Sequence, residues 1–295
     1  MRKTTIGVCS YRNAEKLAAT LESIQRHSTT DWRLVIVHNP ADGDEDARGV
    51  ITRAVFANDR ISVVWNDTNE GYAGAVNRLK YDCRTRYLLY CDNDVEIRTH
   101  GWDEKLCEVM DQHDRVAWVF PGAGHYGFFN GAYHECLWNA GYCWAMRVAA
   151  QGIGNGYFDT ALGHHEEVDY MIRLRLAGYR IAARPDVHVI HHETATRSDD
   201  ALHKPGGRIH DGVVRWMNKW NNYFCGGELE YSMTKYDPRA LRYTDWPPCA
   251  LYLERWTLAQ FPQWNAQVEQ VQTQAGVMDA VKVLKPHGPY AGRAI

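Results

Sequence analysis

The chain has 295 residues, 45% of them hydrophobic, and a formal net charge of −3 at pH 7. This balance argues against a protein that holds nucleic acid chiefly through its phosphates, and the eight cysteines stand singly, without the Cys-x-x-Cys pairs of a zinc or redox site. With no signal-peptide pattern and no apolar run of the length that spans a bilayer, we expect a cytoplasmic protein without a transmembrane segment.

Short apolar runs alternate with helical patterns in the first part of the chain. The expected strands there are residues 6–10, 34–37 and 61–65. Residues 13–27 carry Leu17, Leu21 and Ile24 at helical spacing, and the acidic residues 42–46 are expected to form a surface turn. A strand, a helix and a strand in this order predict parallel pairing, so we expect an α/β fold.

Small residues follow the strand at 61–65. Asn69 precedes Gly71 and Gly74, which allow the backbone to approach a ligand, and Asn77 offers an amide one turn later. The alternative interpretation is a tight strand-to-helix turn without a ligand.

Residues 87–91 are apolar or aromatic and predict a strand buried on both faces, which leads into Asp92, Asn93 and Asp94. Alternation places Asp92 and Asp94 on the same side at the carboxyl edge of the sheet, where ligands bind in open α/β sheets. Two carboxylates repel each other unless a cation lies between them, and Mg²⁺ and Mn²⁺ prefer oxygen ligands. A diphosphate-bearing substrate held through a metal is therefore the first hypothesis, and a solvated turn is the alternative.

The second half continues with a helix that includes Trp102 and a strand at residues 116–120. Residues 122–131 predict an irregular loop, 135–147 are strand-like, and the glycine-containing residues 151–156 are typical of a mobile segment. A helix then opens with Glu166, Glu167 and Asp169, more acidic residues than capping requires. Helix N-termini project toward the carboxyl edge, where a base is useful.

One more strand is expected over residues 180–192, which ends in His191 and His192. Beyond residue 194 the pattern becomes aromatic, with helical stretches expected at 216–224 and 264–284. We expect a domain at residues 1–197 and an aromatic-rich extension packed on it at 198–295, with acceptor-side or oligomer contacts.

These segments together resemble family 2 glycosyltransferases of the GT-A fold, particularly the rhamnosyltransferase-like branch, in which helices flank a mostly parallel central sheet. The segments that carry the resemblance are residues 11–13, 17, 21–24, 69–77, 87–96, 158–159, 166–169, 173, 175, 177–181 and 185–192. The resemblance implies an inverting transfer of a sugar from a nucleoside diphosphate sugar to an acceptor hydroxyl.

The resemblance also implies roles for individual residues. Asp94 would bind Mn²⁺ or Mg²⁺, Asp92 would contact the metal or the ribose, and His191 or His192 would complete the metal shell. Glu167 would be the base that accepts the acceptor's proton, with Glu166 as its rival and Asp169 beside it. The residues expected against the nucleotide sugar are Ser10, Tyr11, Arg12, His38, Asn69, Gly71, Gly74, Asn77, Asp92 and Asn93.

One position departs from the family pattern. The family usually has an acidic residue at the end of its second strand, whereas this chain has His38 followed by Asn39 and Pro40. An imidazole offers different hydrogen bonds from a carboxylate, which leaves the nucleotide open.

The acceptor is expected to be a glycan or a lipid-linked glycan, and DNA carrying hydroxymethylated bases is the alternative acceptor. The residues that suggest DNA are Trp216, Trp220, Trp246 and Trp256 for stacking, with Lys204, Arg208, Arg215 and Lys219 for phosphates. A metal-dependent hydrolase is a further alternative, based on His164, His165, His191 and His192 near Glu166 and Glu193. The last alternative is a non-catalytic module that binds a sugar nucleotide.

Overall fold

The computed structural model describes residues 3–122, 128–129, 132–136, 141–150, 156–192, 207, 211–212, 214–216 and 218–220. The chain divides into two compact units. The first unit comprises Met1–Thr160 and Glu166–Ala195, and the second comprises Ala161–His165 and Thr196–Ile295.

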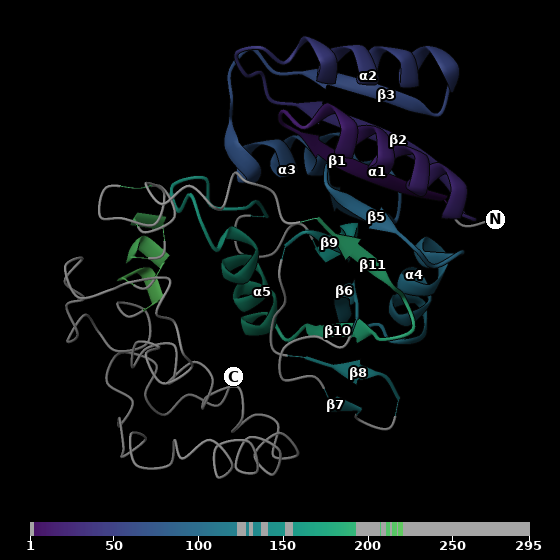
Figure 1. Cartoon of the computed structure of the whole chain (residues 1–295). Helices are drawn as coiled ribbons and strands as arrows, with labels where there is room; N and C mark the ends of the chain where they lie inside the picture. Colours follow the sequence, from purple (N-terminus) through teal and green to yellow (C-terminus); the bar gives the residue numbers. More distant parts are fainter. Residues whose placement is uncertain are drawn as a thin grey trace. The chain divides into compact units, whose positions relative to one another are not determined.

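A nine-stranded sheet forms the centre of the first unit, in the order β3-β2-β1-β4-β9-β6-β10-β8-β7. Figure 1 shows β3, β2 and β1 side by side at one end of the sheet and β8 and β7 at the other. The strands are β1 (Lys3–Ser10), β2 (Asp31–His38), β3 (Ile61–Trp65), β4 (Tyr87–Asp92), β5 (Val95–Ile97), β6 (Val116–Pro121), β7 (Phe128–Phe129), β8 (His134–Glu135), β9 (Cys143–Arg147), β10 (Arg180–Arg184) and β11 (Val189–His191).

The large sheet is mixed: four of its pairings are parallel and four are antiparallel, although most of its strands run in the same direction. β1 pairs in parallel with both β2 and β4, β2 pairs with β3, and β6 pairs with β10. β9 is antiparallel to β4 and β6, between which it lies, and β8 is antiparallel to β10. The carboxyl ends of β1, β2, β3 and β4 therefore meet at one edge.

Five helices accompany the strands of the described first unit: α1 (Ala14–His27), α2 (Glu45–Ala57), α3 (Gly71–Asp82), α4 (Trp102–Gln112) and α5 (Glu166–Leu176). The expectation for residues 42–46 is wrong in part, because Glu45 and Asp46 form the first turn of α2. Acidic side chains there complement the helix dipole. Ala47 and Ile51 of this helix are buried, and Val50, Ala54 and Val55 pack on the same core while partly buried, so its apolar residues follow helical spacing.

The strand expected over residues 180–192 is two strands. Pro185 and Asp186 form a turn after β10, and β11 then pairs with β5 in a separate two-stranded sheet. The strand-like stretch 135–147 likewise contains β8 and β9, with residues 137–140 between them outside the described part.

The two faces of the large sheet have different cores. Ile6, Val8, Leu34 and Ile36 belong to a mostly aliphatic cluster that includes buried residues of α1, α2 and α4. Alternation directs Gly7 to the opposite face, where its position lies against Leu79 of α3. This second face carries an aromatic layer, formed by Tyr72, Tyr90, Trp118, Trp144, Phe158 and Tyr170.

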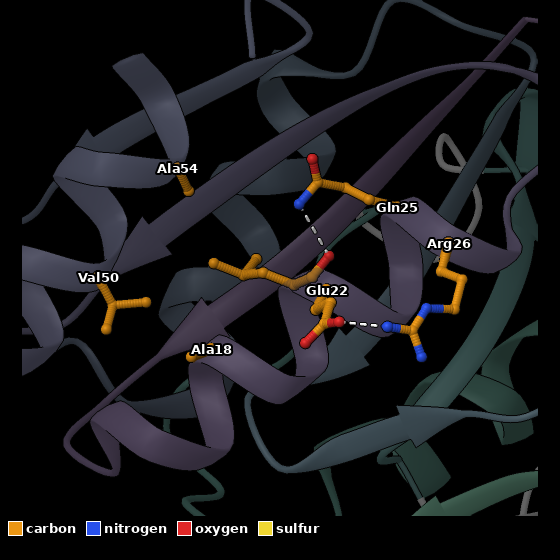
Figure 2. A pocket seen from close by; sticks show the side chains of 7 residues that line it. Ala18, Glu22, Gln25, Arg26, Val50 and Ala54 are labelled. Atoms are coloured by element: carbon orange, nitrogen blue, oxygen red, sulfur yellow. Dashed lines mark hydrogen bonds and ion pairs between the residues drawn. The ribbon is translucent and has the colours of Figure 1, made fainter. Parts of the chain in front are cut away.

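A shallow groove of about 490 Å³ lies between α1 and α2. Figure 2 shows its lining, with the ion pair between Glu22 and Arg26 on α1 and with Val50 and Ala54 on α2. None of the residues predicted to be catalytic, to bind the metal or to bind the nucleotide lines this groove.

Several sequence expectations lie outside the described residues. These are the glycine-containing segment 151–155, most of the loop at 123–131, and the extension beyond residue 220. None of the described helices has the length and hydropathy needed to cross a membrane.

Candidate active site

Asp92, Asp94 and His191 lie together where β4 ends. β4 stops at Asp92, a turn carries Asp94, and β5 then pairs with β11 so that His191 lies opposite Val95. His191 Nε2 is 3.3 Å from Asp94 Oδ1 and 3.9 Å from Asp92 Oδ2. One ligand atom from each of the three residues lies within 4.8 Å of the others.

This cluster has the chemistry of a divalent cation site. Asp94 is 5% exposed, and no described residue hydrogen-bonds to its Oδ1. A buried carboxylate oxygen without a hydrogen bond is costly unless a cation lies near it. Two carboxylates and an imidazole suit Mn²⁺, and Mg²⁺ accepts the same oxygens. Within the described residues this is the one His/Cys/Asp/Glu group close enough to hold a metal.

The two neighbouring histidines differ in their surroundings. The His191 ring stacks on Tyr142, with 4.5 Å between ring centroids and an interplanar angle of 16°. The His192 ring instead points to Glu96, with Nε2 3.2 Å from Oε2, while the His192 backbone N–H donates to the Asp94 carbonyl. His191 is therefore the imidazole that faces the two aspartates.

The three carboxylates at the start of α5 also differ. Glu166 is 3% exposed, and Asp169 is fully buried and paired with Arg173 at 2.9 Å. Glu167 is only half-buried. Of the three, Glu167 is thus the carboxylate with the most access to a substrate.

Gly141 separates Glu167 from Tyr72. A Cβ at Gly141 would lie 2.8 Å from the Tyr72 hydroxyl and 3.0 Å from Glu167 Cγ. The Tyr72 hydroxyl donates to the Gly141 carbonyl at 3.1 Å and accepts a hydrogen bond from Trp144 Nε1 at 3.4 Å. Glycine is thus needed here for close packing.

The charges of Glu167 and Asp92 both affect the ionisation of the Tyr72 hydroxyl. Burial raises the pKa of Tyr72 well above its ordinary value, and the carboxylates of Glu167 and Asp92 raise it further. Glu167 on α5 and Asp92 at the end of β4 therefore both interact electrostatically with the Tyr72 hydroxyl. This arrangement suits a reaction in which a cation and a carboxylate base act on one substrate.

The glycine turn before α3 has internal structural partners. Asn69 Oδ1 accepts from the Gly71 N–H at 2.9 Å, and Gly71 has a φ of +70°, which favours glycine. A Cβ at Gly74 would lie 2.6 Å from the Cβ of Glu70. These contacts shape a tight turn.

Asn77, one turn further along α3, holds the segment before α5. Its Oδ1 accepts from the Phe158 N–H at 2.7 Å, and its Nδ2 donates to the Phe158 carbonyl at 2.9 Å. Both ends of the amide are therefore used within the protein.

His38, at the end of β2, is fully buried. Its Nε2 lies 2.8 Å from Asp44 Oδ2, and its Nδ1 lies 3.3 Å from Ser10 Oγ. Burial lowers the pKa of His38, although its hydrogen bond to Asp44 opposes this effect. Because both ring nitrogens have partners, the side chain joins the ends of β1 and β2 to the start of α2.

Asn93 connects the acidic turn to the end of β1. Its Nδ2 donates to the carbonyls of Tyr11 and Arg12 at 3.1 and 3.3 Å. Arg12 and Asn13 have φ values of 55° and 53°, so the amide secures a left-handed backbone turn.

Sequence reasoning missed four residues of this site. Tyr72, Tyr90, Gly141 and Tyr142 surround the acidic groups, and none was selected as a candidate. Tyr90 carried a usable signal, since it stands two residues before Asp92 on one strand and shares its face. Its hydroxyl donates to Asp92 Oδ1 at 2.5 Å.

The residues selected for DNA contact belong to the second unit. Trp216 and Trp220 are each 4% exposed, and the Arg215 guanidinium donates to the Leu162 carbonyl at 2.9 Å. Lys204, Arg208, Trp246 and Trp256 lie outside the described residues.

Of the residues on which the hydrolase alternative depends, Glu193 also lies outside the described residues. The rings of His164 and His165 are in contact, with centroids 4.4 Å apart.

Comparisons with known proteins agree with this architecture. The family model described as glycosyl transferase family 2 matches residues 5–161. A curated relative, the teichoic acid poly(glycerol phosphate) polymerase of Staphylococcus epidermidis, is 32% identical over 103 residues. That match covers 34% of this chain and 14% of the relative, so the chain spans only a small part of that protein.

Solved structures share the fold at low sequence identity. The mannosyltransferase PcManGT from Pyrobaculum calidifontis, in complex with GDP-Man and Mn²⁺, has a TM-score of 0.58 at 14% identity and covers 94% of this chain and 85% of its own. S. aureus TarS 1–349 in complex with UDP-GlcNAc has a TM-score of 0.55 at 16% identity, with coverages of 78% and 68%. GalNAc-T7 with UDP, GalNAc and Mn²⁺ has a TM-score of 0.54 at 14% identity, with coverages of 64% and 43%.

Proposed function

Since the chain belongs to glycosyl transferase family 2 and has the GT-A fold, we propose that it transfers a sugar from a nucleoside diphosphate sugar to an acceptor hydroxyl, with inversion at the sugar. The observation that carries this proposal is that Tyr72 connects two kinds of acidic group: its hydroxyl and Glu167 pack against the same residue, Gly141, and its ring contacts Tyr90, which donates to Asp92. The Asp92–Asp94–His191 cluster suits a cation, and Glu167 offers a half-buried base.

Asp92, Asp94 and His191 are the proposed ligands of Mn²⁺ or Mg²⁺. A bound divalent ion at this site would offset the negative charge that develops on the departing diphosphate. The buried Asp94 oxygen without a hydrogen bond supports this assignment, and so does the Mn²⁺ bound to GalNAc-T7 and to PcManGT, which have the same fold. Tyr142 contributes by fixing the plane of the His191 ring.

Glu167 is the proposed base that accepts the proton of the acceptor hydroxyl. A single displacement needs one such base, on the side of the sugar opposite the leaving group, and inverts the anomeric centre. Glu166 and Asp169 are buried, and we propose that they support the start of α5 rather than contact the acceptor.

The nucleotide is proposed to bind along the ends of β1, β2 and β4. Ser10, Tyr11, Arg12 and Asn93 would form this wall, and the turn with Asn69, Gly71 and Gly74 would form the opposite one. His38 and Asn77 would act indirectly, since both ring nitrogens of His38 and both ends of the Asn77 amide already have partners within the protein. Both UDP and GDP sugars are candidate donors, because TarS binds UDP-GlcNAc and PcManGT binds GDP-Man.

A glycan or lipid-linked glycan is the proposed acceptor. The curated relative is named as a teichoic acid polymerase, which supports a polymer other than DNA as the acceptor. The burial of Trp216 and Trp220 also removes two of the rings on which the DNA alternative depends.

A donor panel tests the proposal. UDP-glucose, UDP-GlcNAc, GDP-mannose and dTDP-rhamnose would be screened by thermal shift with Mn²⁺ and with EDTA, followed by assays of nucleoside diphosphate release and of product anomeric configuration. We expect one donor to stabilise the protein in a metal-dependent way, by about 2–4 kcal/mol at saturating excess.

The base assignment has its own variant pair. Glu167→Gln should keep the donor-dependent thermal shift and lose nucleoside diphosphate release, because the amide cannot accept the proton. Glu166→Gln is the matched control, one residue away and buried, and should retain release. Unchanged nucleoside diphosphate release by Glu167→Gln would exclude Glu167 as the base.

Two outcomes of the wild-type assays would favour the alternative functions. Release of free sugar without acceptor would favour a hydrolase, and donor binding without any turnover would favour a binding module.

A further inference from the structure

Tyr90 is held rigidly next to a proposed metal ligand. It is fully buried in the aromatic layer, with its ring stacked on Trp144 at 5.0 Å and 22° and in edge contact with Tyr72 at 5.6 Å. From this position the Tyr90 hydroxyl donates to Asp92 Oδ1 at 2.5 Å. A ring packed on two sides cannot follow the carboxylate if it turns, so the hydroxyl defines one orientation of Asp92.

In that orientation the two carboxylate oxygens of Asp92 have different neighbours. Oδ1 accepts from Tyr90, whereas Oδ2 lies toward His191 Nε2 at 3.9 Å. Asp94 contributes its Oδ1 to the same cluster, 3.3 Å from the imidazole. The carboxylate of Asp92 is therefore turned so that a single oxygen faces the other two ligand candidates.

We propose that Tyr90 is a positioning residue that holds Asp92 with one oxygen toward the metal, and so sets the metal affinity of the site. This inference rests on the proposed function, because it assumes that Asp92, Asp94 and His191 hold a divalent ion. Its physical basis is that fixing a ligand before the ion binds removes the cost of ordering it afterwards. Groups that hydrogen-bond to metal ligands typically change metal affinity by about 10–100-fold when they are removed.

The donor role of Tyr90 is stable over the working pH range. Burial raises the pKa of the Tyr90 phenol well above its ordinary value, and the charge of Asp92 raises it further. The phenol therefore keeps its proton and is the donor in its hydrogen bond to Asp92.

The test is a Mn²⁺ titration of the full chain, alone and with UDP or GDP, followed by the EPR signal of free Mn²⁺ and corrected for the nucleotide's own binding. Tyr90→Phe removes the hydroxyl and keeps the stacked ring. We expect its Mn²⁺ affinity to fall about 10-fold.

Tyr87→Phe is the matched control on the same strand. Tyr87 is also fully buried, and its hydroxyl also donates to a carboxylate, that of Asp111. It lies three residues before the other tyrosine, so alternation directs it to the opposite face, away from Asp92. We expect its Mn²⁺ affinity to equal that of the wild type, even if its melting temperature falls.

The outcomes separate this inference from the function on which it rests. Wild-type affinity in Tyr90→Phe, together with lost affinity in Asp94→Asn, would overturn the role of Tyr90 and leave the metal site intact. Equal weakening in the two tyrosine variants would also overturn it, because the effect would then be general. Failure of the wild-type protein to bind Mn²⁺ in every titration would overturn both the inference and the metal-dependent function.

Discussion

Lys80 on α3 carries an amine into the aromatic layer, and its removal should stabilise the protein. The residue is 1% exposed, and its Nζ lies 3.8 Å from the ring centroid of Tyr170 and 5.3 Å from that of Phe158. No described residue hydrogen-bonds to this Nζ. Burial, with a smaller effect of Arg173, lowers the pKa of Lys80 from 10.5 to about 6.

The magnitude follows from proton linkage. At pH 7 the amine is mostly neutral in the folded protein and protonated in the unfolded chain, so folding releases a proton and the stability rises with pH from about 6 to 10.5. The interval between pH 7 and 10.5, at about 1.36 kcal/mol per pH unit, corresponds to a cost of about 5 kcal/mol at pH 7. Lys80→Met keeps the length of the side chain and removes this cost.

We expect Lys80→Met to exceed the wild type in free energy of unfolding at pH 7 by several kcal/mol. The advantage should shrink by about 1.4 kcal/mol for each pH unit up to pH 9. Urea unfolding at pH 7, 8 and 9, followed by tryptophan fluorescence, measures the difference directly.

Lys105→Met is the control for this series. Lys105 is a partly exposed residue whose Nζ lies 2.6 Å from Asp186 Oδ2, so its removal should change the stability little and without this slope. The reasoning is refuted if Lys80→Met is less stable than the wild type at pH 7, or if the difference between them does not depend on pH.

Two further variants test contacts around the proposed site. In Gly141→Ala the added Cβ would lie 2.8 Å from the Tyr72 hydroxyl and 3.0 Å from Glu167 Cγ, so it would displace Glu167. We expect turnover of the best donor to fall at least about 10-fold with unchanged donor affinity. Turnover equal to that of the wild type would contradict this. Asn77→Ala removes both hydrogen bonds to the Phe158 backbone, and urea unfolding should show a loss of about 2 kcal/mol, whereas a loss below about 0.5 kcal/mol would show that the amide does not hold this segment.

Much of the fold could be predicted because its strands are short, apolar and separated by clear turns. β1, β2, β3, β4 and β6 appear where the apolar runs predict them, and the resemblance to family 2 of the GT-A fold is confirmed. The rhamnosyltransferase-like branch stays a prediction. α2 is absent from the prediction although Ala47, Val50, Ile51, Ala54 and Val55 follow helical spacing, because the acidic residues that open it were interpreted as a surface turn.

The positions of site residues could be predicted from the sequence where a single strand or helix determines them. They could be predicted less well where pairing or packing between distant segments determines them. Asp92 ends β4 and Asp94 stands in the turn after it, so their short separation and the sheet edge predicted that they lie together, although strand alternation does not extend to Asp94. Adjacent positions such as His191 and His192 are equivalent in sequence, and only the register of β11 against β5 gives them different surroundings. Likewise, the burial of Glu166 beside the half-buried Glu167 depends on how α5 packs.

The reversed direction of β9 has a consequence for how this chain tolerates length changes. Because β9 runs against β4, the residues that come just before it, Gly141 and Tyr142, reach the rim at which β4 finishes. Deleting one residue within β9 would exchange its two sides, so that Trp144 would leave the aromatic layer and Cys143 or Ala145 would enter it. The same slip would displace Tyr142 from His191, so the loss of one residue from β9 would disable both the packing of the sheet and the proposed metal centre.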